Sequence, residues 1–429
     1  MNAGKFVSNS QLALLLSFSV LCSAAPPPVA TSTNHVLEIS TLDSGGAVSS
    51  SANYVIETTL GQPADASASS SANSLISGFY QLAHETFYHF ANDAQGWIFF
   101  SFPTIYTAPT SSTSGGRIAL TTSSNAGTYG YFQCPAFKIA ANTLYRCRFL
   151  VNTDVGNPLA VPGFRMRAHT TNFQSAQILG VNSLLNGSEA PTATPRAYDL
   201  YYFPAQQVAS SAENSMFMTF EILNFDPTDA ANATLAVQDA IVDALPIANL
   251  SGERAEKTYT FNTNEEGWTF NTVAPTYSAP LSFQLTSDGG VVGMTSTTNT
   301  NTFGFWQSPA DVSTEAGRLY RATFAIHTNV ADPTRVPQLR VRLLAEGFQL
   351  TMEGISDSAG SALASPVTTN RDFDLFMVPP QSQVGTVSDG LIAALDMINF
   401  NSSATPDDPT GSFSMDQMTI RSYIVPPLP

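Results

Sequence analysis

Charged side chains are scarce in this chain of 429 residues. They make up only 12% of the sequence, and Lys5, Lys138 and Lys257 are its only lysines. Long amphipathic helices need many Glu, Lys and Arg residues on their solvent faces, so the composition argues against a helical fold. The formal net charge is −16, and a negative surface repels phosphate backbones. We therefore expect no nucleic-acid partner.

Long apolar runs are absent after the N-terminus, so we expect no transmembrane helix in the mature chain. Residues 1–25 have the pattern of a signal peptide instead. Lys5 precedes a short apolar run from Leu12 to Leu21, and the small residues Ser23, Ala24 and Ala25 follow it. We therefore expect an exported protein that is extracellular, at the cell surface or in the periplasm.

Cysteine is also rare, with three in the whole chain. Cys22 belongs to the predicted signal peptide, which leaves Cys134 and Cys147 as an even pair in an oxidising compartment. These two residues are candidates for a disulfide. The alternative is that they are two buried thiols that pack as small hydrophobic side chains.

What the sequence does contain is alternation with a period of two. The segments 145–149 and 164–168 alternate apolar and polar residues, and so do 320–324 and 339–343. One buried and one exposed face is typical of antiparallel sandwiches. With 27 Gly and 27 Pro residues for the turns, we expect an all-β fold.

The chain also repeats itself over a long distance. The motif at 90–97, which ends in Gly96-Trp97, matches 261–268, which ends in Gly267-Trp268. Further matches join 129–135 to 303–309, 144–146 to 319–321, 165–167 to 340–342, and 173–174 to 348–349. Each copy is long enough for a complete sandwich, so the repeat indicates a duplicated domain.

The repeat divides the chain into five parts. We predict a signal peptide at 1–25, a small strand-rich region with a Ser-rich repeat at 26–82, a first β-sandwich at 86–246, a linker at 247–257, and a second β-sandwich at 258–427.

Taken together, the repeated motifs resemble a known group. Gly-Trp at the start, Gln-x-Pro and Leu-Tyr-Arg in the middle, and Arg-x-Arg after a proline are similar to the galactose-binding-like jelly-roll group, which includes carbohydrate-binding and adhesive modules of secreted bacterial proteins. The resemblance implies about eight strands per module. It also implies sugar binding at loop tips or on a concave sheet, and a structural Ca²⁺ in many members.

Alternation also identifies candidate binding residues. Phe164 and Met166 are expected in the core, so the arginines beside them face outward. The same reasoning predicts two outward-facing sets on one sheet face, Arg165, Arg167, Asp199, Tyr201 and Glu221 in the first copy and Arg340, Arg342, Asp374, Phe376 and Asp396 in the second. Surface ion pairs contribute only about 0–1 kcal/mol, so stability alone explains these sets weakly. They predict a site for a polysaccharide or cell-surface glycan, or else a lattice that sets strand register.

Two further features have alternative interpretations. Trp97 and Trp268 could stack against a sugar ring or pack in the core, where large aromatic residues dominate. Acidic loops at Asp226 and Asp229, and at Asp407 and Asp408, could hold a structural Ca²⁺ or form solvated turns, because no EF-hand spacing occurs.

Signals for catalysis are poor. The chain contains neither a Gly-x-Ser-x-Gly motif nor a phosphate-binding glycine loop. Asp199 and Glu221 could be paired as in a glycosidase. We expect an exported, non-catalytic binding or adhesion protein that recognises glycans through tandem jelly-roll modules. The alternatives are a structural spacer of the cell surface or matrix with no small ligand, and a glycoside-active enzyme.

Overall fold

The computed structural model describes the strands within 30–77 and most of the chain from 84 onward. From 84 onward it leaves out 92, 123–126, 171–174, 182–189, 213, 225–229, 231, 287–289, 298–300, 346–349, 357–364, 380–383, 386–389, 400–407 and 426–429. The predicted signal peptide at 1–25 lies outside the described residues. None of the described helices has the length and apolarity that crossing a bilayer requires.

The chain divides into two compact units, Met1–Ala83 and His84–Pro429. The first unit contains strands, as predicted for this region. They are β1 (Ala30–Ser32) paired with β2 (His35–Leu37), and an antiparallel sheet of β3 (Ala47–Ser50), β4 (Val55–Thr59), β5 (Asp65–Ser69) and β6 (Ser74–Ser77).

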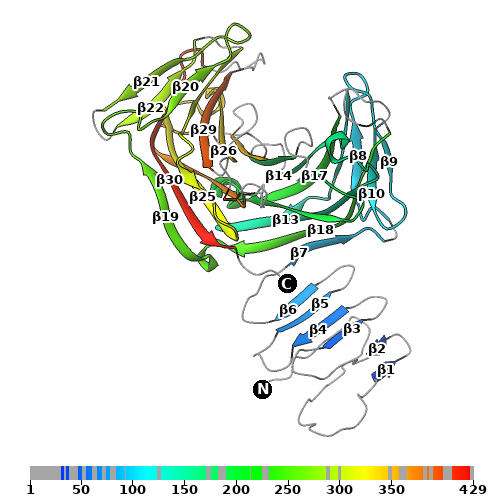
Figure 1. The fold of residues 1–429 in the computed structure, drawn as a ribbon. Helices are drawn as coiled ribbons and strands as arrows, with labels where there is room; N and C mark the ends of the chain where they lie inside the picture. Colours follow the sequence, from blue (N-terminus) through cyan, green and yellow to red (C-terminus); the bar gives the residue numbers. More distant parts are fainter. Residues whose placement is uncertain are drawn as a thin grey trace. The chain divides into compact units, whose positions relative to one another are not determined.

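The second unit is all-β and contains two tandem β-sandwiches, which confirms the predicted fold class. We call β7–β18 the first module and β19–β30 the second module (Figure 1). Each module has a six-stranded sheet of its own. Both modules also contribute strands to one shared twelve-stranded sheet.

The first module's six-stranded sheet is antiparallel. Its order is β16 (Arg196–Tyr202), β13 (Thr143–Thr153), β18 (Thr234–Pro246), β10 (Ile118–Thr121) and β9 (Thr110–Ser112), with β7 (His84–His89) also paired to β18. The second module repeats this layout with β28 (Arg371–Met377), β25 (Arg318–Thr328), β30 (Ser412–Ile424), β22 (Val291–Thr295) and β21 (Leu281–Leu285), and with β19 (Ser251–Tyr259) also paired to β30.

The twelve-stranded sheet runs through both modules. Its order is β20 (Thr269–Thr272), β23 (Thr302–Gln307), β29 (Gly390–Asn399), β26 (Gln338–Ala345), β27 (Leu350–Ser356), β15 (Ser175–Val181), β14 (Gly163–Thr170), β17 (Ser215–Asn224), β11 (Thr128–Gln133) and β8 (Ile98–Ser101), with β24 (Val312–Ser313) on β29 and β12 (Phe137–Lys138) on β17. The chain passes back and forth between the two sheets, as in a jelly roll: β13, β16 and β18 belong to the six-stranded sheet, and β14, β15 and β17 between them belong to the twelve-stranded sheet.

The two modules meet where β15 pairs with β27. The pairing is antiparallel, and Ile178 lies opposite Glu353 at its centre. The offset of 175 residues that aligns Phe173 with Phe348 also maps Ile178 onto Glu353. Each module therefore presents the same edge strand to the other, as in an isologous dimer with two-fold symmetry.

Aromatic side chains from both sheets fill the core of the first module. Phe164 and Phe220 come from the twelve-stranded sheet, and Phe149 from the six-stranded sheet; all three are fully buried. The Phe164 and Phe220 ring centroids lie 6.0 Å apart, and those of Phe149 and Phe220 lie 6.5 Å apart. The inward direction predicted for Phe164 and Met166 is confirmed.

Cys134 and Cys147 are buried free thiols, so the candidate disulfide is absent. The Cys134 sulfur already has partners in the core, since Met218 N donates a hydrogen bond to Sγ at 3.0 Å. Burial raises the pKa of the Cys134 thiol to about 12, which disfavours the reactive thiolate. The alternative interpretation, two thiols packed as small hydrophobic side chains, matches this arrangement.

The segment predicted as a linker at 247–257 is mostly structured. Strand β19 begins at Ser251 and pairs with β30, and only a short 3₁₀ turn at Ile247–Asn249 separates it from β18. The mostly polar and exposed side chains of β19 suit the edge of a sheet, which explains why its sequence resembles a linker.

In each module the glycine of the Gly-Trp motif packs against the proline of the Gln-x-Pro motif. Gly96 has φ +81°, and a Cβ placed there would lie 2.9 Å from Pro135 Cγ. In the second module Gly267 has φ +85° and faces Pro309 in the same way. The Gly-Trp motif and the Gln-x-Pro motif are therefore neighbours in space, which explains why the sequence repeats them together.

We predict that Gly96→Ala destabilises the protein more than Gly115→Ala does. Both glycines have positive φ, so either substitution costs about 1–2 kcal/mol of backbone strain. Only Gly96 faces a close neighbour, because nothing lies within 4 Å of a Cβ at Gly115. Crowding against Pro135 should add about 1–3 kcal/mol, measured by urea unfolding. Equal losses for the two variants would show that the contact with Pro135 is not tight.

Candidate functional site

A buried carboxylate held by two arginines lies on the outer face of the twelve-stranded sheet in the first module. Arg165 on β14 is directly opposite Glu221 on β17. Arg165 Nε and Nη2 donate to Glu221 Oε2 at 2.8 and 2.5 Å, and Arg167 Nε donates to Oε1. The Glu221 side chain is fully buried, whereas Arg165 and Arg167 are 28% and 14% exposed.

The second module repeats this cluster. Arg340 on β26 is directly opposite Asp396 on β29. Arg340 Nε donates to Asp396 Oδ2 at 2.5 Å, and Arg342 Nη2 donates to Oδ1 at 2.9 Å. Asp396 is fully buried, as Glu221 is. We call these two groups the Arg–carboxylate clusters.

The charge of Glu221 influences its neighbours. Burial lowers the pKa of Arg165, but the charge and hydrogen bonds of Glu221 outweigh this effect, so the pKa is raised and the guanidinium stays charged. Tyr129 Oη donates to Glu221 Oε2 at 3.2 Å. Burial, and next the charge of Glu221, raise the pKa of Tyr129 to about 12. The phenol therefore stays neutral and remains a donor at physiological pH.

Aromatic side chains flank the cluster in the first module. Tyr131 on β11 lies directly opposite Glu221 on one side and Phe100 on the other. The rings of Phe100 and Tyr131 stack with centroids 5.2 Å apart, and those of Phe102 and Tyr129 stack at 5.8 Å. Phe100 and Phe102 are 37% and 42% exposed, so part of each ring meets solvent.

In the second module the arginines lie over the aromatic rings. The Arg340 guanidinium is 5.7 Å from the Phe303 ring centroid, and that of Arg342 is 5.1 Å from Phe305. Tyr277 meets Phe303 edge-on at 5.8 Å. Asn271 lies opposite Phe305, in the place that Phe100 has in the first module. The two copies share the arginines and aromatic rings but differ at the rim.

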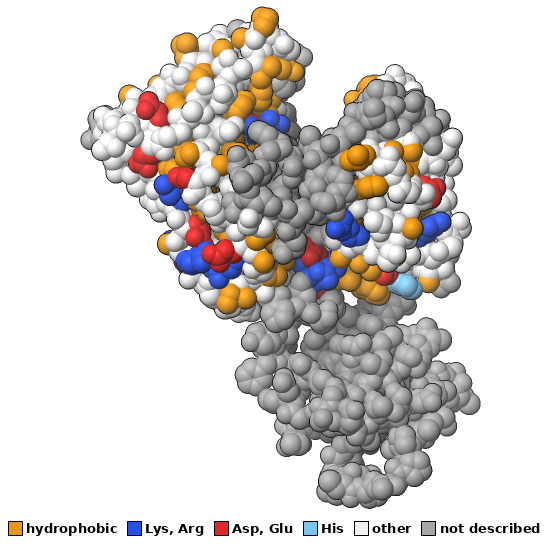
Figure 2. Space-filling model, in the orientation of Figure 1, with side chains coloured by type: hydrophobic (Ala, Val, Ile, Leu, Met, Phe, Trp, Pro, Cys, Tyr) orange, Lys and Arg blue, Asp and Glu red, His pale blue; other side chains and the backbone are white. Residues whose placement is uncertain are grey.

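A glutamine completes the shared face. Gln133 lies opposite Thr219, which is itself opposite Arg167. Gln307 has the matching position in the second module, across from Ala394 and Arg342. Cross-strand partners point to the same side of a sheet. The shared face therefore carries six positions that match between the modules, which in the first module are Tyr129, Tyr131, Gln133, Arg165, Arg167 and Glu221. On the side drawn in Figure 2, the coloured Lys and Arg side chains form small groups, many of them next to Asp or Glu and to hydrophobic surface.

The remaining predicted site residues lie elsewhere, which corrects the expectation of one common face. Asp199 and Tyr201 are on β16, which pairs with β13 in the six-stranded sheet. Arg148 donates to both Asp199 oxygens at 2.7 Å. Tyr201 is 2% exposed. The outward direction predicted for Asp199 is right, but its sheet is opposite to that of Glu221, because the jelly roll alternates between sheets.

The second module shows the same separation. Asp374 and Phe376 are on β28 of the six-stranded sheet. Arg321 donates to Asp374 at 2.8 and 3.0 Å, and its guanidinium lies 5.6 Å from the Phe376 ring. Phe376 is fully buried and lies 5.6 Å from Phe203 of the first module. It therefore packs between the modules and presents no ring to a ligand.

Because Asp199 and Glu221 lie on opposite sheets, they do not form the glycosidase pair that the sequence suggested. Asp199 and Glu221 point outward from opposite sheets of the sandwich, and packed sheets are about 10 Å apart before the side chains are counted. Paired glycosidase carboxyls lie about 5–10 Å apart on either side of one bond. These two residues cannot flank one glycosidic bond.

The tryptophans pack in the core. Trp97 and Trp268 are 4% and 3% exposed. Trp97 meets Tyr88 edge-on at 5.4 Å, and Trp268 meets Tyr259 in the same way at 5.6 Å. The core interpretation of both residues is confirmed.

The acidic loops are only partly described. Asp226, Asp229 and Asp407 lie outside the described residues. Asp408 Oδ1 accepts hydrogen bonds from the Thr410 backbone N–H and hydroxyl, both at 2.9 Å, as in a solvated turn. Among the residues that the structure describes, no group of three or more His, Cys, Asp or Glu side chains could hold a metal. A structural Ca²⁺ remains a prediction for the undescribed loops.

The candidate residues predicted from the sequence do not include the aromatic residues on the outer face of the twelve-stranded sheet, although the sequence contains a signal for two of them. Tyr129 and Tyr131 alternate with the core residue Phe132, which already places them on the outer side. Their relation to Glu221 depends on the pairing of β11 with β17, which are far apart in the sequence. Periodicity alone does not reveal that pairing.

Comparisons with known proteins give weak likenesses. No family model matches the chain, and no curated protein matches it. The tandem CBM22-1–CBM22-2 domain of Paenibacillus barcinonensis Xyn10C is 12% identical, with 80% of this chain and 98% of that chain covered and a TM-score of 0.26. The xylan-binding module CBM15 is 9% identical, with 37% and 96% covered and a TM-score of 0.27.

A plant protein gives a similar result. The ANX2 ectodomain from Arabidopsis thaliana is 8% identical, with 84% of this chain and 94% of that chain covered and a TM-score of 0.25. At such scores these likenesses carry no argument about this chain, and the site rests on its own geometry.

We predict that Glu221→Gln destabilises the protein by about 3–5 kcal/mol, because it removes the buried countercharge of two arginines. Asp199→Asn is the matched control. It breaks an Arg–carboxylate pair whose partners are 28% and 26% exposed, so it should cost no more than about 1 kcal/mol. Guanidinium unfolding measures both. A loss for Glu221→Gln as small as that of the control would contradict the buried ion cluster.

We also predict that the free energy of unfolding depends on pH through His169. This residue follows Arg167 on the same face of β14, is fully buried and meets the Phe217 ring at 4.0 Å. Burial, and next the charge of Arg167, lower the pKa of His169 to about 3. The unfolded chain protonates at about 6.5. The stability from keeping His169 neutral is therefore complete above pH ~6.5 and is lost as the pH falls toward 3.

Between pH 7 and pH 5, unfolding free energies should fall by about 2 kcal/mol more in the wild type than in His169→Gln. Parallel pH profiles for the wild type and His169→Gln would rule out a neutral buried His169.

Proposed function

We propose that the chain is an exported, non-catalytic protein that binds a polysaccharide or a cell-surface glycan on the outer face of the twelve-stranded sheet. In the first module the proposed site consists of Phe100, Phe102, Tyr129, Tyr131, Gln133, Arg165, Arg167 and Glu221. In the second it consists of Tyr277, Phe303, Phe305, Gln307, Arg340, Arg342 and Asp396.

One observation carries this proposal: partly exposed aromatic rings lie beside fixed arginines on the same face of both modules. Phe100 and Phe102 are 37% and 42% exposed, and the arginines beside them are held by Glu221. A solvent-facing ring has lost part of the burial that normally stabilises an aromatic side chain. Two such rings beside a fixed polar cluster are typical of a binding surface.

The chemistry of the face suits a sugar. A pyranose ring presents C–H groups on its faces, which pack against aromatic rings, and hydroxyls at its edge, which hydrogen-bond to planar guanidinium and amide groups. Arg165 keeps 28% of its side chain exposed while Glu221 fixes its position. Binding to a preorganised donor costs less side-chain entropy than binding to a mobile one.

Duplication fits this function. Two weak sites on one chain can engage a repeating ligand together, which strengthens binding without a new contact. Both Arg–carboxylate clusters lie on one continuous sheet, separated only by β15 and β27. Strands in a sheet are about 4.8 Å apart, so β14 and β26 are separated by about 14 Å.

A glycan array of neutral and acidic polysaccharides, probed with the full-length protein, tests the proposal. We predict that Phe100→Ala with Phe102→Ala weakens binding of the best ligand at least tenfold, or about 1.4 kcal/mol. Phe87→Ala is the matched control, because Phe87 is 51% exposed on the six-stranded sheet of the same module. It should bind as the wild type does.

Two outcomes would overturn the proposal. Equal losses for the site variant and for Phe87→Ala would remove the outer face from the binding reaction. A wild-type protein that binds no glycan but assembles into polymers would favour the structural spacer instead.

A further inference from the structure

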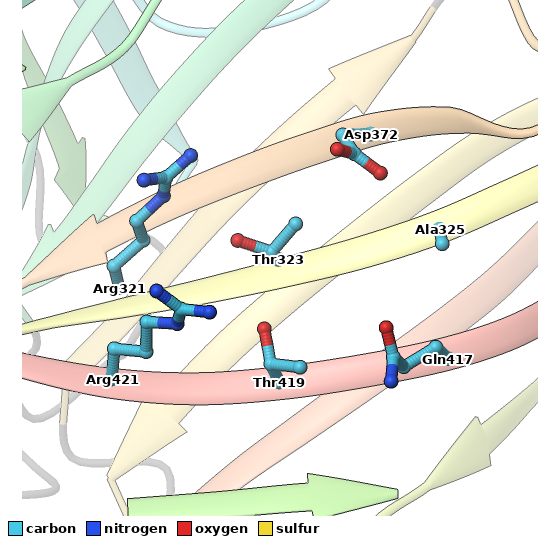
Figure 3. A pocket seen from close by; sticks show the side chains of 7 residues that line it. All are labelled: Arg321, Thr323, Ala325, Asp372, Gln417, Thr419 and Arg421. Atoms are coloured by element: carbon cyan, nitrogen blue, oxygen red, sulfur yellow. The ribbon is translucent and has the colours of Figure 1, made fainter. Parts of the chain in front are cut away.

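The second module has a hollow on the opposite side of its sandwich, away from the proposed glycan face. It lies on the outer face of the six-stranded sheet, over β25, β28 and β30, and has a volume of about 300 Å³. Figure 3 shows Arg321 and Arg421 side by side at one end, with Asp372 and Gln417 at the other. Every side chain that lines it, apart from that of Ala325, is polar.

The hollow follows from the register of three strands. Arg321 on β25 lies directly opposite Arg421 on β30. The next outward row pairs Thr323 with Thr419, and the row after it pairs Ala325 with Gln417. The small Ala325 and the short threonines form the floor, because the longer side chains stand at the ends.

The first module shows what the same sheet looks like without a hollow. Where the second module has Ala325, the first has Leu150, and in the place of Thr419 it has Ile241. Arg148 stands where Thr323 does. Larger side chains therefore occupy the floor in the first module, so the fold itself does not require the hollow.

The charges at one end of the hollow also differ between the modules. Arg146 of the first module is opposite Asp243, and the two form a buried ion pair. Arg321 of the second module is instead opposite a second arginine, and like charges directly opposite on neighbouring strands are destabilising.

The carboxylates near the two arginines lie to either side of them. Arg321 pairs with Asp374, and Arg421 pairs with Glu253 in a contact where both partners are about half exposed. Such an exposed pair contributes little to stability. An anion held between the two guanidinium groups would offset their repulsion and use the planar geometry of both.

We propose that this hollow is a second binding site, for a hexuronate: a sugar unit whose carboxylate lies between Arg321 and Arg421. Its hydroxyls bind Thr419, Gln417 and Asp372 along the floor and the far end. The volume is at the lower end of the range for ligand pockets, which suits one sugar unit. The site is separate from the proposed glycan face and does not depend on it.

Isothermal titration of the full-length protein with D-galacturonate and D-glucuronate tests this site. D-galactose lacks the carboxylate and acetate lacks the hydroxyls, so both should bind at least tenfold more weakly than the uronates. Polygalacturonate is titrated as well. If the protein binds this polymer but neither free uronate, the ligand is a uronate unit within a polysaccharide chain. Failure of the wild type to bind any uronate, free or polymeric, in the millimolar range overturns the proposal.

The sharpest variant fills the hollow with the first module's own side chains. Ala325→Leu with Thr419→Ile should fold normally, because the first module holds Leu150 and Ile241 at the matching positions. It should weaken uronate binding at least tenfold while the melting temperature stays unchanged. Unchanged binding by this variant, with folding verified by circular dichroism, places the ligand elsewhere.

A second pair of variants separates this site from the glycan face. Arg421→Gln should weaken uronate binding at least tenfold, whereas Phe100→Ala with Phe102→Ala should leave it as in the wild type. If the aromatic variant loses uronate binding and Arg421→Gln keeps it, the uronate binds on the twelve-stranded sheet and the hollow is not its site.

Discussion

The antiparallel ladder between β15 and β27 is the contact on which the arrangement of both modules depends. It joins an edge strand of each sandwich into one sheet and pairs Ile178 with its own counterpart, Glu353. Antiparallel neighbours are related by a half-turn about the sheet normal, and the matched strands of the twelve-stranded sheet follow in mirrored order on the two sides of this ladder. Side chains at matched positions therefore point to the same side of a single sheet.

Local pattern was enough to predict the fold class and the outward direction of the two arginines in each module, because both depend on alternation along single strands. Phe164 in the core implied Arg165 outside, and the structure agrees. Which strands become neighbours depends on contacts between distant segments, and periodicity carries no information about them. Asp199 was therefore assigned to the face of Glu221, although β16 pairs with β13 in the other sheet. The same limit concealed Tyr131, whose partner across the ladder is Glu221.

The duplication provides an internal control for what the fold requires. On the twelve-stranded sheet both copies keep the Arg–carboxylate cluster, the aromatic rings and the glutamine. On the six-stranded sheets the outward rows differ, since Arg146 faces Asp243 in one module and Arg321 faces Arg421 in the other. A fold that tolerates both arrangements dictates neither. The fold alone therefore does not account for the side chains that differ between the two six-stranded sheets, whereas those on the twelve-stranded sheet are kept in both modules.

The two-fold relation has a consequence for any ligand with a direction. A polysaccharide has different ends, and a straight chain that crosses β17 toward β14 in the first module would cross β26 toward β29 in the second. The direction of the polysaccharide relative to the matched side chains would therefore be opposite at the two sites. If both sites recognise the same polarity, two chains in opposite directions satisfy them, and one straight chain does not. Avidity would then come from antiparallel neighbours in a bundled or surface-bound polymer, because such an array presents both directions within reach of one protein.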